Sequence, residues 1–194
     1  MLNPTNPYAS SKAAAEFIVR SYHKSFEMPI IITRCNNVYG KNQYPEKIIP
    51  KFTMQLLNGE KITVHGDGKN LRTFIHTIDV VSAIETILLK GMNGKVYNIG
   101  TNNEYSVMEI ARKLIYLLEG TIKDTSEADR PKGESVGDSI EFIKDREFND
   151  KRYSLDCSEL KALGWEETVD FEKGLKETVD WYIENGDRYL KRPT

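Results

Sequence analysis

Apolar residues in the chain fall either at helical spacing or in short continuous runs. The segment after Asn6 has helical spacing and starts with a proline, so it predicts a helix from about Pro7 to Phe26. The run Ile30–Thr33 has no polar alternation, which is typical of a strand covered on both faces. A helix followed by a buried strand is half of a parallel α/β unit.

Helix and strand patterns continue to alternate towards the C-terminus. Ser106 and Glu109 form a capping box that opens one of the helices, which we expect to end at Gly120. Residues 121–151 are of mixed charge and predict one strand, around 140–143. The other predicted helices are 48–57, 77–90, 157–163 and 171–185, and the other predicted strands lie within 61–66, 71–76 and 95–100. The pattern therefore predicts an α/β fold throughout.

Composition and charge exclude several classes of function. The 194 residues contain 27 Lys+Arg and 29 Asp+Glu, so the formal net charge of −2 gives no general attraction to nucleic acid or to an anionic membrane. The longest apolar runs are far shorter than the roughly 20 residues of a membrane span. Cys35 and Cys157 could form at most one disulfide and match no metal-ligand spacing. We therefore expect a cytoplasmic protein with no metal site.

Tyr8 and Lys12 lie four residues apart at the start of the first predicted helix, on one face and about one turn apart. An ammonium close to a phenol lowers the pKa of the phenol, so such a pair can transfer protons near neutral pH. The spacing alone is a weak signal, because an exposed pair on a solvated helix has the same pattern.

The surrounding sequence is more specific. The segment PTNPYASSKAAAEF is followed by the strand IIITR and the turn NNVYG, which resembles the extended short-chain dehydrogenase/reductase family. Further motifs resemble the nucleotide-diphosphate-glucose 4,6-dehydratases of that family, and they occur in the family's order: YPEKIIPKF, VHGDGKNLRTFIHTIDV, YNIGTNNEYSV, DREFNDKRYSLD, LGW and DWY.

This resemblance implies a catalytic role for Tyr8 and Lys12. Both residues, together with Val38, would contact a bound NAD. In the implied reaction the C4 position of the glucose is oxidised, water is lost across C5 and C6, and the hydride returns at C6 to give a 4-keto-6-deoxy sugar nucleotide. A phenolate would take the proton of the C4 hydroxyl without help from a metal.

The resemblance also implies a set of residues that bind the nucleotide-diphosphate-glucose substrate. An arginine can bind a diphosphate through two parallel hydrogen bonds, and strand ends of open α/β sheets collect such ligands. Without the resemblance, the arginine of LRTFIH, the histidine of TVHG and the lysine of PEK are equally compatible with ordinary surface positions. Whether the base is thymine or uracil stays open. The implied substrate-binding residues are Asn37, Lys47, Ile48, Thr63, His65, Arg72, Arg146 and Asn149.

The resemblance further implies a division into domains. Residues 1–40 would be the C-terminal part of a Rossmann-type, NAD-binding parallel-sheet domain, to which parts of 71–105 would return. Residues 41–194 would form mainly a smaller mixed α/β domain for the nucleotide sugar. The chain contains no G-x-G-x-x-G motif, so we expect a C-terminal portion of a dehydratase that does not turn over substrate by itself. A homodimer formed through the tyrosine-lysine helix is also implied. The apolar Phe17, Ile18 and Tyr22 of this helix are compatible with that contact and equally with packing against the rest of a Rossmann sheet.

Two alternatives remain at this stage. An epimerase or decarboxylase of the same family would share the tyrosine-lysine pair and the arginine-bearing strand, although the YPEK-IIP stretch favours a dehydratase. A non-catalytic nucleotide-sugar-binding module is the alternative from another class, and it would bind the sugar nucleotide tightly without NAD.

Overall fold

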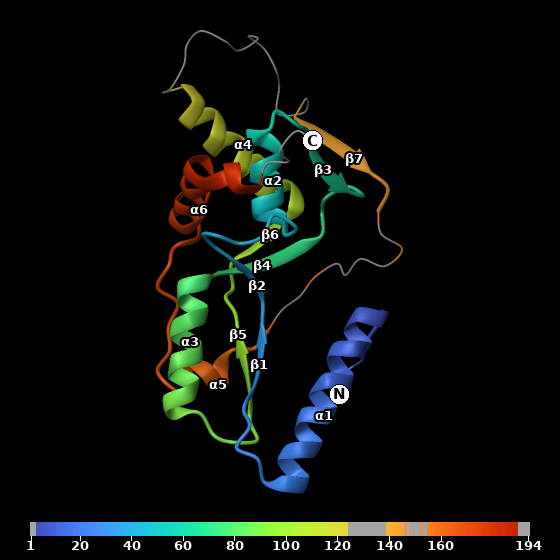
Figure 1. Ribbon diagram of the computed structural model, residues 1–194, viewed down its shortest axis with the longest axis vertical. Coiled ribbons are helices and arrows are strands. Elements are labelled where there is room, and N and C mark those ends of the chain that lie inside the picture. Colours follow the sequence, from blue (N-terminus) through green and yellow to red (C-terminus); the bar gives the residue numbers. More distant parts are fainter. Residues whose placement is uncertain (1–2, 124–138, 146, 148–151, 153–154, 190–194) are drawn as a thin grey trace.

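A computed structural model describes residues 3–123, 139–145, 147, 152 and 155–189 (Figure 1). The predicted α/β fold is confirmed, with short sheets between helices. The helices are α1 (Pro7–Phe26), α2 (Ile48–Leu57), α3 (Thr77–Lys90), α4 (Val107–Lys123), α5 (Ser158–Lys161), α6 (Phe171–Asn185) and the 3-10 helix η1 (Gly186–Tyr189). The strands are β1 (Ile32–Cys35), β2 (Asn37–Tyr39), β3 (Ile62–His65), β4 (Leu71–His76), β5 (Val96–Ile99), β6 (Glu104–Ser106) and β7 (Ile140–Ile143).

The strands form three small sheets. β1 pairs in parallel with β5, and β3 pairs in parallel with β7. In the third sheet, β4 is the middle strand between β2, which is parallel to it, and β6, which is antiparallel. A single residue, Asn36, separates β1 from β2, so the first and third sheets are joined directly at the carboxyl end of β1.

The first helix follows its predicted bounds, but the strand after it does not. The Asn6 side chain caps α1 by accepting a 2.8 Å hydrogen bond from the Ala9 amide. The predicted run Ile30–Thr33 is displaced to β1, in which half-buried and exposed residues alternate instead of being covered on both faces. The reason is that β1 has β5 as its one neighbouring strand among the described residues.

Other differences from the prediction are small. β2 and β6 were not predicted, because three residues are too few to show a period. α4 continues past Gly120 to Lys123, and α5 is limited to four residues. The capping box is confirmed: the Glu109 carboxylate accepts from the Ser106 amide at 2.7 Å, and the Glu109 amide donates to Ser106 Oγ at 3.1 Å.

The buried apolar residues form two separate clusters. The larger one joins α2, α4 and α6 to β2, β3, β4 and β7, and includes Phe52, Leu114 and Leu175. The smaller one joins β5, α3, α5 and the end of β4, and includes Tyr97 and Trp165. β4 contributes Phe74 to the larger cluster and Ile75 to the smaller one, so this strand connects the two cores.

Candidate functional site

The first part of the candidate site lies at the carboxyl end of β1. α1 precedes β1 and runs in the opposite direction, so the beginning of α1 lies towards the carboxyl end of β1 (Figure 1). Tyr8 and Lys12 are both exposed there, with 74% of Tyr8 accessible to solvent. In parallel α/β sheets the carboxyl ends of the strands are where ligands bind. The position therefore suits a proton-transferring pair.

At this strand end, the side chain of Asn36 lies directly against the backbone of Gly100. The carbonyl oxygen Oδ1 of Asn36 is buried and has no hydrogen-bond partner. It lies so close to Gly100 that any side chain at this position would collide with it. An unpaired buried acceptor at this strand end fits the nicotinamide-ribose end of NAD, which offers hydroxyl and amide donors.

Asn37 and Val38 continue from this point along β2. Asn37 pairs with Phe74 of β4, and its side-chain amide donates to the Thr73 carbonyl at 3.2 Å. Asn37 is exposed, whereas Val38 is half-buried against the smaller core cluster. Asn37 is therefore held with its polar side chain at the surface, as a ligand-binding asparagine must be.

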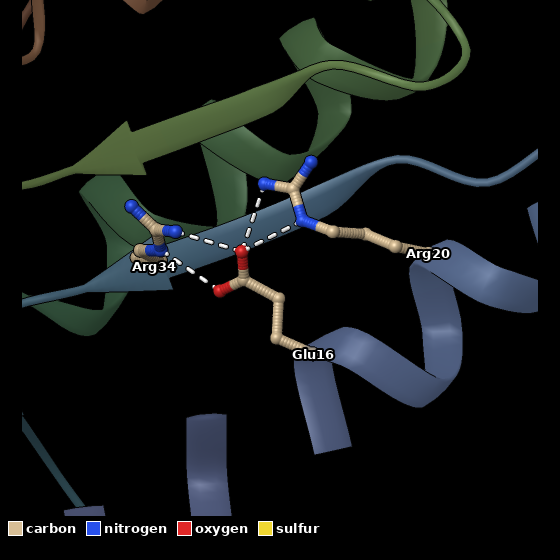
Figure 2. Close-up of polar contacts among 3 residues, drawn as sticks. All are labelled: Glu16, Arg20 and Arg34. Carbon is tan, nitrogen blue, oxygen red and sulfur yellow. Dashed lines mark hydrogen bonds and ion pairs between the residues drawn. The ribbon is translucent and has the colours of Figure 1, made fainter. Parts of the chain in front are cut away.

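Glu16 links α1 to β1 through its carboxylate (Figure 2). Arg34 on β1 donates from Nη2 to Glu16 Oε1 at 2.7 Å and from Nε to Oε2 at 3.0 Å. Arg20, one turn further along α1, donates to Oε1 at 2.8 and 3.0 Å. The hydrogen bonds from Arg34 are the main cause of a pKa for Glu16 below its ordinary value, and the bonds from Arg20 add to this. The carboxylate is therefore ionised at neutral pH.

The residues proposed to bind the diphosphate come from β4 and from the start of α2. Arg72 on β4 is half-buried and donates from Nη1 to the Leu71 carbonyl at 2.7 Å. Lys47 immediately precedes α2, with an exposed side chain 3.3 Å from the Glu46 carboxylate. Ile48 is the first residue of α2 and is half-buried against the larger core.

Thr63 and His65 lie on β3, beside β7. Their neighbours on the strand, Ile62 and Val64, are fully buried, so Thr63 and His65 face the opposite side of this two-stranded sheet. Thr63 contacts the side chain of Gln55 through two bonds of 3.4 Å. His65 Nδ1 lies 3.3 Å from the Lys144 carbonyl.

The structure thus places the predicted residues in separate groups. Asn37 and Arg72 lie on adjacent strands, and Thr63 and His65 share a strand. No hydrogen bond among the described residues joins Tyr8 to Lys12 or joins either of them to the other groups. Arg146 and Asn149 lie outside the described residues. Sequence reasoning missed Asn36, Glu16 and Arg34, although the position of Glu16 four residues after Lys12 would have indicated the same side of the helix.

Within the described ranges, neither a metal site nor a membrane-spanning helix is present. There, no three His, Cys, Asp or Glu side chains are grouped so as to hold a metal ion. In the same ranges no helix has the length and hydropathy needed to cross a membrane. Both cysteines are free thiols.

Comparison with known proteins gives consistent matches. A family model described as GDP-mannose 4,6 dehydratase matches residues 1–178. The chain is 47% identical to a mouse (Mus musculus) dTDP-D-glucose 4,6-dehydratase over 183 residues, which are 94% of this chain and 49% of the mouse protein. It is 45% identical over 184 residues to a trifunctional Arabidopsis thaliana enzyme whose name includes UDP-glucose 4,6-dehydratase; the match covers 95% of this chain and 26% of that protein.

A crystal structure gives the same result for the fold. A dTDP-glucose 4,6-dehydratase from Streptomyces venezuelae, solved with NAD and TYD bound, matches with a TM-score of 0.86 and 37% identity over 97% of this chain and 54% of the other. The chain thus spans about half the length of the mouse protein and of this solved structure, and about a quarter of the Arabidopsis protein.

Proposed function

The chain belongs to the GDP-mannose 4,6-dehydratase family, and on this basis we propose that it is part of an NAD-dependent dTDP- or UDP-glucose 4,6-dehydratase of deoxysugar biosynthesis. The observation that carries the proposal is the exposed Tyr8–Lys12 pair near the carboxyl end of β1. Asn36 and Asn37 directly follow this strand in the chain. The names of the Arabidopsis and mouse relatives specify UDP-glucose and dTDP-D-glucose, respectively.

The proposed chemistry assigns a role to each of these side chains. A bound NAD would supply the hydride acceptor for the oxidation at C4 of the sugar and the hydride donor for the reduction at C6. The Tyr8 phenolate accepts the proton of the C4 hydroxyl. Lys12 favours the phenolate by its positive charge and donates a hydrogen bond to the ribose of the cofactor. Val38, half-buried on β2, would contact the nicotinamide end, and Asn37 would hold the sugar.

The nucleotide diphosphate is assigned to the smaller domain. Arg72 is half-buried and carries a guanidinium, which suits two parallel bonds to a phosphate. Lys47 adds a second positive charge, with Ile48 beside it as an apolar contact. Thr63 and His65 on β3, and Arg146 and Asn149, complete the proposed nucleotide contacts.

The assay that tests this function measures product formation by the full-length protein with NAD and either dTDP-glucose or UDP-glucose. We expect a product lighter than its substrate by one water, detected by mass spectrometry. Tyr8→Phe keeps the ring but removes the proton acceptor, so it should lower kcat by about 10²- to 10⁴-fold. The matched control is Tyr116→Phe on α4, which is 77% exposed and should keep wild-type kcat. Absence of the dehydrated product from both nucleotides would contradict the proposal.

The same assay separates the alternatives. An epimerase gives a product of unchanged mass, and a decarboxylase consumes a uronic acid with loss of carbon dioxide. A non-catalytic module gives no product but binds the sugar nucleotide tightly without NAD, which calorimetry would detect. The dehydratase matches and the YPEK-IIP stretch favour the dehydratase.

The domain division is also part of the proposal. Residues 1–40, with parts of 71–105, are assigned to the cofactor domain, and 41–194 mainly to the nucleotide-sugar domain. The two buried clusters support this division, since the smaller one contains residues of β5 and α3, which lie within 71–105. We also propose a cytoplasmic location, in keeping with the two free thiols.

A homodimer through α1 is the proposed assembly. α1 has no buried residue, and large apolar side chains along its second half are exposed. An apolar surface of this kind is typical of a contact with another protein surface. Sedimentation of the full-length protein tests the proposal: Ile18→Glu should shift a dimer towards monomer, whereas Tyr116→Glu on α4 should not. A monomeric wild-type protein at tens of micromolar would contradict it.

A further inference from the structure

The Glu16 carboxylate lies on the same helix as the two proposed catalytic residues. It follows Lys12 by four residues and Tyr8 by eight, so the three side chains succeed one another along one side of α1. Only 11% of the Glu16 side chain is exposed, although Tyr8 and Lys12 are open to solvent. On a helix that has no fully buried residue, this carboxylate marks a place where α1 is attached to the rest of the molecule.

α1 has few other attachments. None of its residues is buried, and none belongs to either core cluster. Within the described part of the chain, the bonds between Glu16 and Arg34 are the only side-chain hydrogen bonds that join α1 to a strand or to another helix. Within the described part of the chain, the two core clusters therefore do not fix where α1 lies along β1.

We infer that Glu16 and Arg34 are positioning residues, which set where Tyr8 and Lys12 lie relative to the carboxyl end of β1. This inference rests on the proposed function. Arg34 lies on β1 three residues before Asn37, the residue assigned to the sugar. Two parallel bonds between a guanidinium and a carboxylate fix both the distance and the relative rotation of the two groups. The pair, which Figure 2 shows, thus fixes the position of α1, and with it that of the phenol, relative to the strand that leads to Asn37.

Arg20 does not have the same role. It bonds to Glu16 Oε1 from the same helix, one turn away, so it neutralises the carboxylate without linking α1 to β1. Substitutions at the two arginines therefore distinguish the positioning of α1 from the neutralisation of the Glu16 carboxylate. Loss of Arg34 removes the link between α1 and β1, whereas loss of Arg20 leaves this link in place.

The test combines two measurements on Glu16→Gln, Arg34→Lys and Arg20→Ala. The first is amide hydrogen exchange of residues 7–26, followed by mass spectrometry. The second is kcat and KM of the full-length protein with the sugar nucleotide. The matched control is Glu172→Gln, which removes an ion pair between α6 and α4 (Lys113) far from α1 in the sequence.

We expect Glu16→Gln and Arg34→Lys to speed exchange in α1 several-fold and to lower kcat by about 10- to 100-fold, because a displacement of about 1 Å costs this much. KM should change little, since Arg72 and Lys47 lie on other elements. Arg34→Lys keeps the positive charge but cannot form both parallel hydrogen bonds to Glu16. Its exchange rates and kcat should therefore resemble those of Glu16→Gln. Arg20→Ala and Glu172→Gln should keep the wild-type kcat.

Several outcomes would overturn the inference. Wild-type kcat in Glu16→Gln contradicts it directly. A fall in kcat with unchanged exchange in α1 also contradicts it, because the carboxylate would then act by charge and not by position. A fall in kcat in Arg20→Ala as large as that in Arg34→Lys would also show that the charge of Glu16, and not its position, matters for turnover. If the wild-type protein forms no product, the proposed function fails, and the exchange rates alone decide whether the ion pair places α1.

Discussion

Asp79 is the most completely buried charged side chain among the described residues. Its carboxylate accepts hydrogen bonds from Thr168 Oγ1 at 2.7 Å, from the Thr168 amide at 3.0 Å and from the Val169 amide at 3.1 Å. These bonds tie the beginning of α3 to the segment that leads into α6. A buried carboxylate is tolerated only where such bonds replace its water shell. Asp79 is thus a structural residue, although it lies close to the strand that carries Arg72.

We predict that Asp79→Ala lowers the free energy of unfolding by about 2–4 kcal/mol, because two amides and a hydroxyl lose their acceptor. Urea unfolding measures this change. Asp180→Ala is the control: Asp180 pairs with Lys176 one turn away at an exposed position, and its loss should cost less than about 1 kcal/mol. Equal losses in the two variants would show that the Asp79 bonds contribute nothing beyond a surface ion pair.

His76 gives a prediction about pH. Its imidazole is 3% exposed, and burial lowers its pKa from the ordinary value of 6.5, although Asp79 and Glu177 act in the opposite direction; Lys41 adds to the lowering. At low pH the unfolded chain therefore binds a proton more readily than the folded one. The contribution to stability is fully present above about pH 6.5 and is lost as the pH falls below it.

Unfolding by urea at pH 7.5 and at pH 5.5 tests this sign. Wild-type protein should lose stability between the two values, and His76→Gln, which cannot take up the proton, should lose less. A wild-type loss that His76→Gln does not reduce would show that other groups carry the pH dependence.

At the scale of elements, the C-terminal helices hold the loop that precedes Lys47. The Tyr182 hydroxyl of α6 donates to the Gln43 carbonyl, and Tyr189 Oη of η1 lies 3.2 Å from Asn42 Oδ1. Gln43 in turn donates to the Val38 carbonyl of β2 at 2.8 Å. Asn42 has a positive φ of 64°, the left-handed conformation that asparagine adopts more readily than most other residues. These hydrogen bonds hold the loop in place.

We predict that Tyr182→Phe loosens this loop while leaving the fold intact. The loss of one buried hydrogen bond costs about 1 kcal/mol, which corresponds to a roughly fivefold higher population of the open loop. Limited trypsin cleavage after Lys41 should therefore become several-fold faster. Tyr116→Phe, whose ring is exposed on α4, should cleave at the wild-type rate. Unchanged cleavage in Tyr182→Phe would show that Tyr189 and Gln43 hold the loop without it.

Most elements could be predicted from the sequence where local chemistry determines them. Helices α1 and α6 begin at side-chain caps, Asn6 and Asp170, and both match their predicted bounds. The position of β1 could not be predicted, because the coverage of its two faces depends on distant elements. In the candidate site, the tyrosine-lysine spacing was visible in the sequence, whereas the contact between Glu16 and Arg34 spans 18 residues and was not.

At the scale of the whole molecule, the two core clusters support two different sets of elements. The larger cluster supports the elements that carry Lys47, Thr63 and His65, and the smaller one supports β5 and α3. β4 joins the two clusters, because Phe74 belongs to the larger one and Ile75 to the smaller one. Arg72 precedes both residues on this strand. A ligand held by the first set of residues therefore stabilises the larger cluster directly and the smaller one only through β4.

Nucleotide binding should thus protect the two clusters unequally. Bound dTDP at 100 times its Kd adds about 2.7 kcal/mol to the stability of whatever unit binds it. We predict that amide exchange slows in α2, β3 and the first half of β4, but little in β5 and α3. Hydrogen exchange with and without dTDP measures this, and Arg72→Ala, which removes the proposed diphosphate ligand, should abolish the protection. Uniform slowing in both clusters would show that they unfold as one cooperative unit. Such a result would contradict the division into a cofactor domain and a nucleotide-sugar domain, because two separable domains would not share the binding energy equally.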